Sequence, residues 1–364
     1  MPPVLEISVQ PSVRAGGHTA AGSKRTPSLE GPIALVTVKE IFDLVRDDLV
    51  RVEQELAEQT GAASEPVGEI ARYLLGGGGK RLRPALLLLS AGYAGYRGPS
   101  AVHLGAVVEL IHSATLIHDD VIDGADTRRG RPSANSRWGN HRSVLAGDWL
   151  YMQSFQMALA ERNFRVLDIL IDLTQSMVQG ELSQLSTLGR MDLAEDEVID
   201  LAARKTACLF SGCARLGGVL GQLSPSEEQS LADYGRYAGV AFQLVDDLLD
   251  FTGSPAQLGK PVLSDLKDGK VTLPLVYALE SAWKNDGAAG RRMVRAVLDE
   301  KGFHSVRPEE ISALVRDSGA LDRTRQLAHD YANRAKACLN GGGAHNEFGR
   351  ALAAVPDFIL DRER

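Results

Sequence analysis

The chain has little of the chemistry on which several common protein classes depend. Only three of its 364 residues are cysteine, and Cys208 and Cys213 have no His or Cys partners at zinc-site spacing. We therefore expect reduced thiols packed in a core, not a disulfide framework. Aromatic residues make up only 5% of the chain, and Ala, Leu and Gly carry most of its apolar content. This composition favours helix over sheet.

The chain also lacks a net positive charge and long apolar runs. The net charge of −7 argues against a nucleic-acid partner. The longest apolar run, around Leu86 to Leu89, is too short to cross a membrane, so we expect no transmembrane segment. The amino terminus lacks the continuous apolar segment of a signal peptide. These absences predict a cytoplasmic protein.

The chain divides into a short tail and one long helical array. Residues 1–35 are rich in Gly, Pro, Ser and Thr without periodicity, which predicts a disordered tail. Residues 36–364 form one predicted domain with apolar residues at helical spacing. Helices are expected from Val36 to Leu56 and at about 66–76, 84–96, 100–123, 141–161, 164–188, 195–219, 226–252, 271–284, 289–301, 308–316 and 320–340. This pattern predicts an all-α, single-domain bundle of ten or more helices.

Two aspartate clusters of identical spacing interrupt this apolar pattern. Asp119-Asp120-Val121-Ile122-Asp123 recurs 127 residues later as Asp246-Asp247-Leu248-Leu249-Asp250. The first and last Asp of each cluster stand at i and i+4 on a helix, where like charges repel each other. Mg²⁺ fits between such clusters because it takes one or two carboxylates and completes its shell with phosphate oxygens. A solvated acidic helix face is the alternative, and two matched clusters argue against it.

Basic residues stand where they can complement these carboxylates. Residues 76–84 form a glycine-rich loop that opens a helix, and Lys80 and Arg83 in it could bind one phosphate. Arg128 to Arg131 follow the first cluster, Lys260 and Lys270 follow the second, and Lys205 lies on a helix between them. Surface salt bridges are the simpler explanation for any one pair. Acids for metal and bases for phosphate together predict a site that holds two diphosphates.

This set of motifs resembles one family, the trans-isoprenyl diphosphate synthases or polyprenyl synthetases. The resemblance runs from about residue 36 to the carboxyl terminus and leaves the tail unmatched. It rests on residues 78–84, 112–120, Asp123 with 128–130, Lys205-Thr206, 242–247, Asp250, 259–261, Asp265-Leu266 and Gly269-Lys270. The resemblance implies the isoprenoid synthase fold, with helices around a central cavity. It also implies a homodimer.

The implied reaction joins isopentenyl diphosphate to an allylic prenyl diphosphate. Mg²⁺, with three ions in each active site, would neutralise charge on the departing diphosphate, and the double bond of isopentenyl diphosphate would attack the resulting cation. The implied metal ligands are Asp119, Asp123 and Asp246. The implied catalytic residues are Asp119, Asp120, Asp123, Asp246, Asp247, Lys205 and Lys260. No protein nucleophile is needed.

The resemblance also divides the remaining polar residues between two substrate sites. Isopentenyl diphosphate would be bound by Lys80, Arg83, His112 and Arg129. The allylic diphosphate would be bound by Arg128, Lys205, Thr206, Gln243, Lys260 and Lys270. His118 is expected to pack against the first aspartate cluster, without a catalytic role.

Product length depends on residues one to two helical turns before Asp119. Ala114 and Thr115 lie roughly 6–8 Å along the helix from Asp119, and both are small. In the resembling enzymes, large aromatic residues at these positions stop the growing chain early. Their absence predicts a long product, heptaprenyl to decaprenyl, of the kind used for quinone side chains. A floor built from another helix, by Phe155, Met157 or Met177, would predict a shorter product.

Three other functions compete with this prediction. A short-chain synthase would make farnesyl or geranylgeranyl diphosphate with the same motifs. A class I terpene cyclase needs only one diphosphate site, whereas this chain has a basic loop and two complete aspartate clusters. A non-catalytic partner subunit would have lost acidic residues, and none is missing here. We also expect a peripheral membrane contact for release of an apolar product.

Overall fold

The structure is a computed structural model that describes residues 37–362 with seven internal gaps. The gaps are 62–64, 66, 78–79, 129, 254–261, 285–287 and 340–344. The predicted tail, residues 1–35, lies outside the described residues, as do Arg129 and Lys260.

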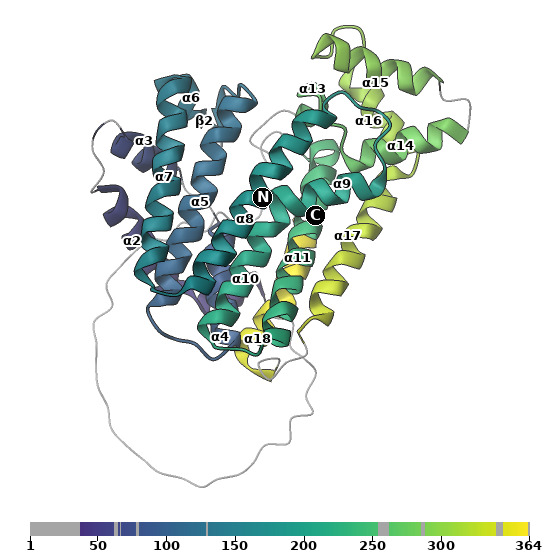
Figure 1. Ribbon diagram of the computed structural model, residues 1–364. Helices are drawn as coiled ribbons and strands as arrows, with labels where there is room; N and C mark the ends of the chain where they lie inside the picture. Colours follow the sequence, from purple (N-terminus) through teal and green to yellow (C-terminus); the bar gives the residue numbers. More distant parts are fainter. Residues whose placement is uncertain are drawn as a thin grey trace. The chain divides into compact units, whose positions relative to one another are not determined.

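Regular structure in the described residues is almost entirely helical (Figure 1). The first half holds α1 (Val38–Asp43), α2 (Arg46–Gly61), α3 (Val67–Leu75), α4 (Leu82–Tyr93), α5 (Ser100–Ile122), α6 (Ala134–Trp138), α7 (Asn140–Ala160) and α8 (Phe164–Thr187). Next come α9 (Glu195–Ala202), the π-helix η1 (Ala203–Ala207), α10 (Cys208–Leu220) and α11 (Pro225–Thr252). The rest comprises α13 (Ser264–Lys267), α14 (Leu273–Lys284), α15 (Ala288–Glu300), α16 (Pro308–Asp317), α17 (Ala320–Ala337) and α18 (Glu347–Asp361). The all-α prediction is confirmed.

Most predicted helices begin and end within two residues of their observed bounds. The start of α11 shows the local reason, because Ser224 caps the helix, its hydroxyl accepts from the backbone N–H of Glu227, and Pro225 occupies the first turn. Periodicity did not predict α18, the short helices α6 and α13, or the hairpin of β1 (Thr127–Arg128) and β2 (Arg131–Pro132). The predicted helix 195–219 is divided by η1, which places Lys205 on a π-helical turn.

The two aspartate clusters lie near the carboxyl ends of the long helices α5 and α11. In Figure 1, α5, α7, α8, α10 and α11 run roughly side by side. Glycines on α11 allow the closest approach, since a Cβ at Gly235 would lie 2.4 Å from the carbonyl oxygen of Phe210. A Cβ at Gly239 would lie 2.5 Å from the Cα of Ala207 in η1. The backbones of α11, α10 and η1 therefore pack at a separation that no larger residue permits.

Helix α5 forms much of the core. Among the described helices it is the one with the length and composition to cross a membrane, but most of its apolar stretch is buried inside the fold. Val107, Leu110 and Ile111 are fully buried on it. Burial against α4 and α7 therefore accounts for its apolar character.

One charged pair lies at the opposite end of α5 from the aspartates. The Nδ1 of His103 pairs with the Glu55 carboxylate of α2, and its Nε2 lies 2.9 Å from the carbonyl oxygen of Met157 on α7. The bond to Glu55 outweighs the effect of burial and raises the pKa of His103 to about 9. Protonated His103 therefore links three helices at neutral pH.

This pair predicts a pH-dependent stability. The folded-state pKa lies above the usual value near 6.5, so its contribution is complete below about pH 6.5 and is lost as pH rises through about 9. The contribution is no more than about 3 kcal/mol. Urea unfolding of the wild type should show this decline between pH 6.5 and 9. His103→Gln should flatten the decline, and an unchanged slope in that variant would contradict the assignment.

Candidate active site

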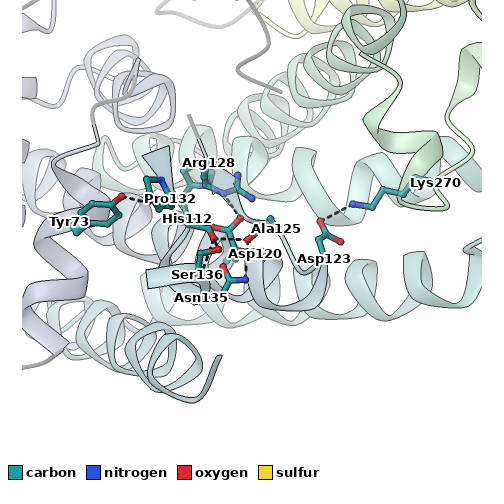
Figure 2. Close-up of polar contacts among 12 residues, drawn as sticks. Tyr73, His112, Asp120, Asp123, Ala125, Arg128, Pro132, Asn135, Ser136 and Lys270 are labelled. Atoms are coloured by element: carbon teal, nitrogen blue, oxygen red, sulfur yellow. Dashed lines mark hydrogen bonds and ion pairs between the residues drawn. The ribbon is translucent and has the colours of Figure 1, made fainter. Parts of the chain in front are cut away.

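The first aspartate cluster projects from the last turn of α5. Asp123 is the C-cap residue of this helix, and its Oδ2 lies 2.9 Å from the Nζ of Lys270, which follows α13 (Figure 2). Two residues predicted on separate motifs are thus in direct contact. The attraction to Asp123 helps to raise the pKa of Lys270 against the opposing effect of its burial.

Asp119 lies one turn earlier on the same side of α5. Burial is the largest influence on its carboxyl group and raises its pKa to about 6. Lys205 opposes this increase, whereas Glu181 and Asp123 add to it. The predicted metal ligand is therefore a half-buried carboxylate with both cations and other carboxylates nearby.

Lys205 is held by α8, whose role the sequence pattern did not predict. Its Nζ lies 2.5 Å from Glu181 Oε2 and 2.7 Å from Gln184 Oε1. A Cβ at Gly180 would lie 2.9 Å from the backbone nitrogen of Lys205, so α8 and η1 touch closely here. π-Helical turns occur often at functional sites because they redirect single side chains. Here η1 directs Lys205 toward Asp119. It directs the next residue, Thr206, toward Gln243 on α11.

Asp120 has a different environment from the aspartates on either side of it in the cluster. It is fully buried, and its Oδ1 accepts from Arg128 Nε at 2.6 Å. Figure 2 shows Arg128 reaching Asp120 from the hairpin, while Lys270 reaches Asp123 from a separate segment. Burial raises the pKa of Asp120, and Arg128 opposes that increase. The predicted allylic-site residue Arg128 is thus fixed by a buried carboxylate.

The second cluster begins with an aspartate that is paired with the end of the chain. Asp246 Oδ1 lies 2.8 Å from Arg362 Nη2, and the Arg362 guanidinium lies 4.3 Å from the centre of the Phe242 ring. Lys80 is close enough to respond to both charges. Burial and Arg362 lower the pKa of Lys80, and Asp246 opposes them. Lys80 and the first residue of the second cluster are therefore within electrostatic range of each other.

The remaining aspartates of the second cluster are buried. Asp247 Oδ1 accepts from Gln243 Nε2 at 2.9 Å, and Gln243 Oε1 accepts from Thr206 Oγ1 at 2.8 Å. Asp250 accepts from Ser264 Oγ at 3.1 Å and from the backbone N–H of Asp265 at 3.3 Å. Asp250 therefore anchors α13. The two clusters share a spacing, but their last aspartates do not share an environment.

Two of the residues predicted to bind isopentenyl diphosphate, Arg83 and His112, form a close pair. Arg83 Nη1 lies 3.1 Å from His112 Nε2, and its guanidinium lies 5.3 Å from the centre of the Phe210 ring. Lys80 is instead within electrostatic range of Asp246 and Arg362, and its Nζ lies 6.0 Å from the centre of the Phe358 ring. The structure thus joins a residue from α4 to one from α5, two segments that are 29 positions apart in sequence.

The two residues predicted to set product length lie behind Asp119 on α5. Ala114 is fully buried, and Thr115 donates through Oγ1 to the carbonyl oxygen of His112 at 2.7 Å. Of the alternative floor residues, Met157 and Met177 are buried and Phe155 is partly buried. His118 packs beside Tyr151, with ring centres 5.8 Å apart, and its Nε2 lies 3.2 Å from the carbonyl oxygen of Val144.

Three further residues of the site did not emerge from the sequence. Glu181 and Gln184 hold Lys205, and Arg362 holds Asp246. A glutamate within the apolar helix 164–188 and basic residues at the chain terminus are weak signals that occur widely. Only the folded arrangement distinguishes them from surface residues.

The carboxylates of the site suit a hard divalent cation. Among residues 37–362 outside the gaps, no three His, Cys, Asp or Glu side chains gather closely enough to hold a metal ion together. Mg²⁺ does not require this, because waters and substrate phosphates supply most of its ligands. Cationic nitrogens already lie 2.9 Å from Asp123 and 2.8 Å from Asp246. The donor set therefore fits Mg²⁺.

Comparison with known proteins identifies the family of this chain. The family model described as polyprenyl synthetase matches residues 64–303. Octaprenyl diphosphate synthase of Escherichia coli is 37% identical over 305 residues, which cover 84% of this chain and 93% of that protein.

Solved structures show the same likeness. A polyprenyl synthase from Caulobacter crescentus, complexed with calcium and isoprenyl diphosphate, superposes with a TM-score of 0.84 at 32% identity and covers 91% of this chain and 99% of its own. A decaprenyl diphosphate synthase from Rhodobacter capsulatus gives 0.81 at 35% identity, covering 90% and 99%.

The helical fold and the likeness to polyprenyl synthases define a prenyl-transferring enzyme of the isoprenoid synthase fold. The chain belongs to the polyprenyl synthetase family. The resemblance, the fold class and the enzyme class that the sequence predicted are confirmed.

Proposed function

We propose that this enzyme condenses isopentenyl diphosphate with an allylic prenyl diphosphate to make a long all-trans polyprenyl diphosphate. The observation that carries this proposal is the contact of Asp123 with Lys270, 147 positions away in sequence, beside Asp119, which also lies within electrostatic range of Lys205. Similarity to octaprenyl and decaprenyl diphosphate synthases supports heptaprenyl to decaprenyl products. A quinone side chain is the proposed use.

The aspartates and bases have distinct proposed roles. Asp119, Asp123 and Asp246 would hold Mg²⁺, about three ions per site, which would supply charge neutralisation to the departing diphosphate. Arg128, Lys205, Thr206, Gln243, Lys260 and Lys270 would bind that diphosphate and orient its carbon–oxygen bond. Binding of Mg²⁺ to Asp123 and Asp246 would require Lys270 and Arg362 to leave these carboxylates. Both basic side chains would then lie beside the bound diphosphate. Released diphosphate is the proposed acceptor of the final proton.

The second substrate has its own proposed binding group. Lys80, Arg83, His112 and Arg129 would hold the isopentenyl diphosphate. The close Arg83–His112 pair supports a shared anion at that point, since an arginine beside an imidazole nitrogen gains from a bridging phosphate. The two diphosphates would then lie on opposite sides of the space where the new carbon–carbon bond forms.

An assay with isopentenyl diphosphate and allylic primers of increasing length tests this function. We expect Mg²⁺-dependent elongation and a loss of at least about 100-fold in kcat for Asp119→Ala or Asp246→Ala, because the departing charge loses its stabilisation. Asp47→Ala, which removes an exposed acid on α2, is the matched control and should keep normal turnover. Normal turnover of the Asp119 variant at saturating Mg²⁺ would contradict the proposal.

The proposed product length depends on the small residues of α5. Ala114 is fully buried, so an aromatic ring at this position must displace the atoms that pack against it. We expect Ala114→Tyr to shift the products toward much shorter chains while early condensations continue. Ala114→Leu should give intermediate lengths, and Thr115→Ser should give wild-type lengths. Mass analysis of the dephosphorylated products measures this. An unchanged product distribution in active Ala114→Tyr would support a floor on another helix.

A homodimer is the proposed assembly. Helices α7 and α8 carry exposed apolar residues at intervals of seven, an arrangement typical of helix-to-helix interfaces. On α7 these are Leu145, Met152 and Leu159, and on α8 they are Phe164, Ile171, Val178 and Leu185. Met152 is 64% exposed and Phe164 is 79% exposed, which is unfavourable in an isolated chain. A second copy with the same stripe would cover both helices.

Sedimentation velocity tests this assembly. The wild type should sediment at about twice the chain mass of 39.1 kDa. Leu145→Glu combined with Met152→Glu should give monomers, because buried carboxylates without partners are costly at such a face. Gln229→Glu on α11 is an exposed control and should remain dimeric. A monomeric wild type would contradict the proposal.

A cytoplasmic location, a peripheral membrane contact and the absence of a nucleic-acid partner stay predictions.

A further inference from the structure

The second aspartate of each cluster is buried and faces away from the first. Asp120 has no exposed surface and Asp247 is 4% exposed, whereas the Asp246 side chain is 36% exposed. Successive residues on an α-helix point about 100° apart. Neighbouring aspartates in these clusters therefore leave the helix in different directions.

Asp120 faces a cavity that is separate from the side of Asp119. This cavity lies between α3, α5 and the hairpin, and its lining includes Glu109, Ser113, Asp120, Arg128 and Arg131. Neither Asp119 nor Asp123 is among its lining residues. The second oxygen of Asp120, Oδ2, is buried and has no hydrogen-bond partner. Asp120 is therefore directed toward the hairpin.

The hairpin that carries Arg128 is anchored independently. The backbone N–H of Ala125 donates to the carbonyl oxygen of Asp120 at 2.9 Å. Ser133 Oγ and Asn135 Nδ2 donate to the carbonyl oxygen of Ala125 at 2.6 and 3.0 Å (Figure 2). With the backbone fixed in this way, the direction of the Arg128 guanidinium depends on the contact between its Nε and Asp120. This contact therefore sets where the terminal nitrogens of Arg128 point.

Asp247 contacts Gln243 directly and is linked to Thr206 through Gln243. It accepts from Gln243 Nε2, which leaves Gln243 Oε1 to accept from Thr206 Oγ1. Without the carboxylate, the Gln243 amide could rotate by half a turn, and its NH2 group would then face Thr206. Thr206 follows Lys205 on η1. Asp247 therefore sets the orientation of a polar chain that ends beside the allylic site.

We propose that Asp120 and Asp247 are positioning residues and not metal ligands. Asp120 orients Arg128, and Asp247 orients Gln243 and, through it, Thr206. Both act on the binding of the allylic diphosphate, so this inference rests on the proposed function. It separates the aspartates of each cluster by role: the first meets the metal, and the second aims the side chains that meet the diphosphate.

Asparagine and alanine variants distinguish the two roles of Asp120. Asp120→Asn keeps an oxygen that accepts from Arg128 Nε, so the KM for the allylic primer should stay within about threefold of the wild type. Asp120→Ala removes the acceptor, and that KM should rise about tenfold or more, the effect of one charge-assisted hydrogen bond. The KM for isopentenyl diphosphate should change by less than about threefold, because Arg83 and His112 are untouched.

Metal binding is read separately by electron paramagnetic resonance titration with Mn²⁺ in the absence of substrate. Asp120→Asn and Asp247→Asn should bind Mn²⁺ with wild-type affinity, whereas Asp119→Asn, the matched control, should bind it at least about tenfold more weakly. Asparagine at the two buried positions carries no charge to desolvate, so both variants should keep the wild-type melting temperature. A folding failure of Asp120→Ala would leave the Mn²⁺ titration of Asp120→Asn to decide.

A second arm tests Asp247 through its partner. Asp247→Leu should raise the KM for the allylic primer, and the same change should add little in a Gln243→Leu background, where no amide remains to orient. Independent, additive effects of the two substitutions would overturn the Asp247 assignment. Weakened Mn²⁺ binding by Asp120→Asn, or an unchanged KM in folded Asp120→Ala, would overturn the Asp120 assignment. A wild type without prenyl transfer would instead refute the proposed function itself.

Discussion

The rest of the site depends on negative charge held at the ends of two apolar, buried helices. Carboxylates in such surroundings are costly unless cations or hydrogen-bond donors meet them. Lys270 meets Asp123, Arg362 meets Asp246, and Arg128 meets Asp120. These partners come from the turn after α13, the carboxyl terminus and the hairpin, so one electrostatic requirement gathers distant segments around the site.

The scaffold makes this charge tolerable by keeping the helices close and fixed. Gly235 and Gly239 bring α11 against α10 and η1, and Gly180 brings α8 against Lys205. With the backbones fixed, side chains such as Gln243 and Thr206 have one favourable arrangement instead of several. A diphosphate that enters the site then meets groups already oriented for it, which lowers the entropy lost on binding.

Periodicity and motif spacing predicted much of this molecule, and the failures have identifiable causes. The long helices were predicted because their apolar stripes are continuous, but α18 and the short elements near the site were not. The identical spacing of the clusters does not extend to the surroundings of their last aspartates. Asp123 meets Lys270, whereas Asp250 anchors the start of α13. Spacing along one helix indicates only the direction in which a side chain points. The residue that this side chain contacts belongs to another segment, so spacing does not predict it.

The sequence by itself determined the class of fold, the family and the presence of paired acidic and basic motifs, because helix periodicity and short motifs are local properties. Only the tertiary structure decided which aspartates are buried, which cation meets each one, and that Glu181 and Arg362 join the site. Two of these contacts join segments more than 100 positions apart, Asp123 with Lys270 and Asp246 with Arg362. Burial and partner choice are set by the surfaces that pack together, and no single segment contains that information.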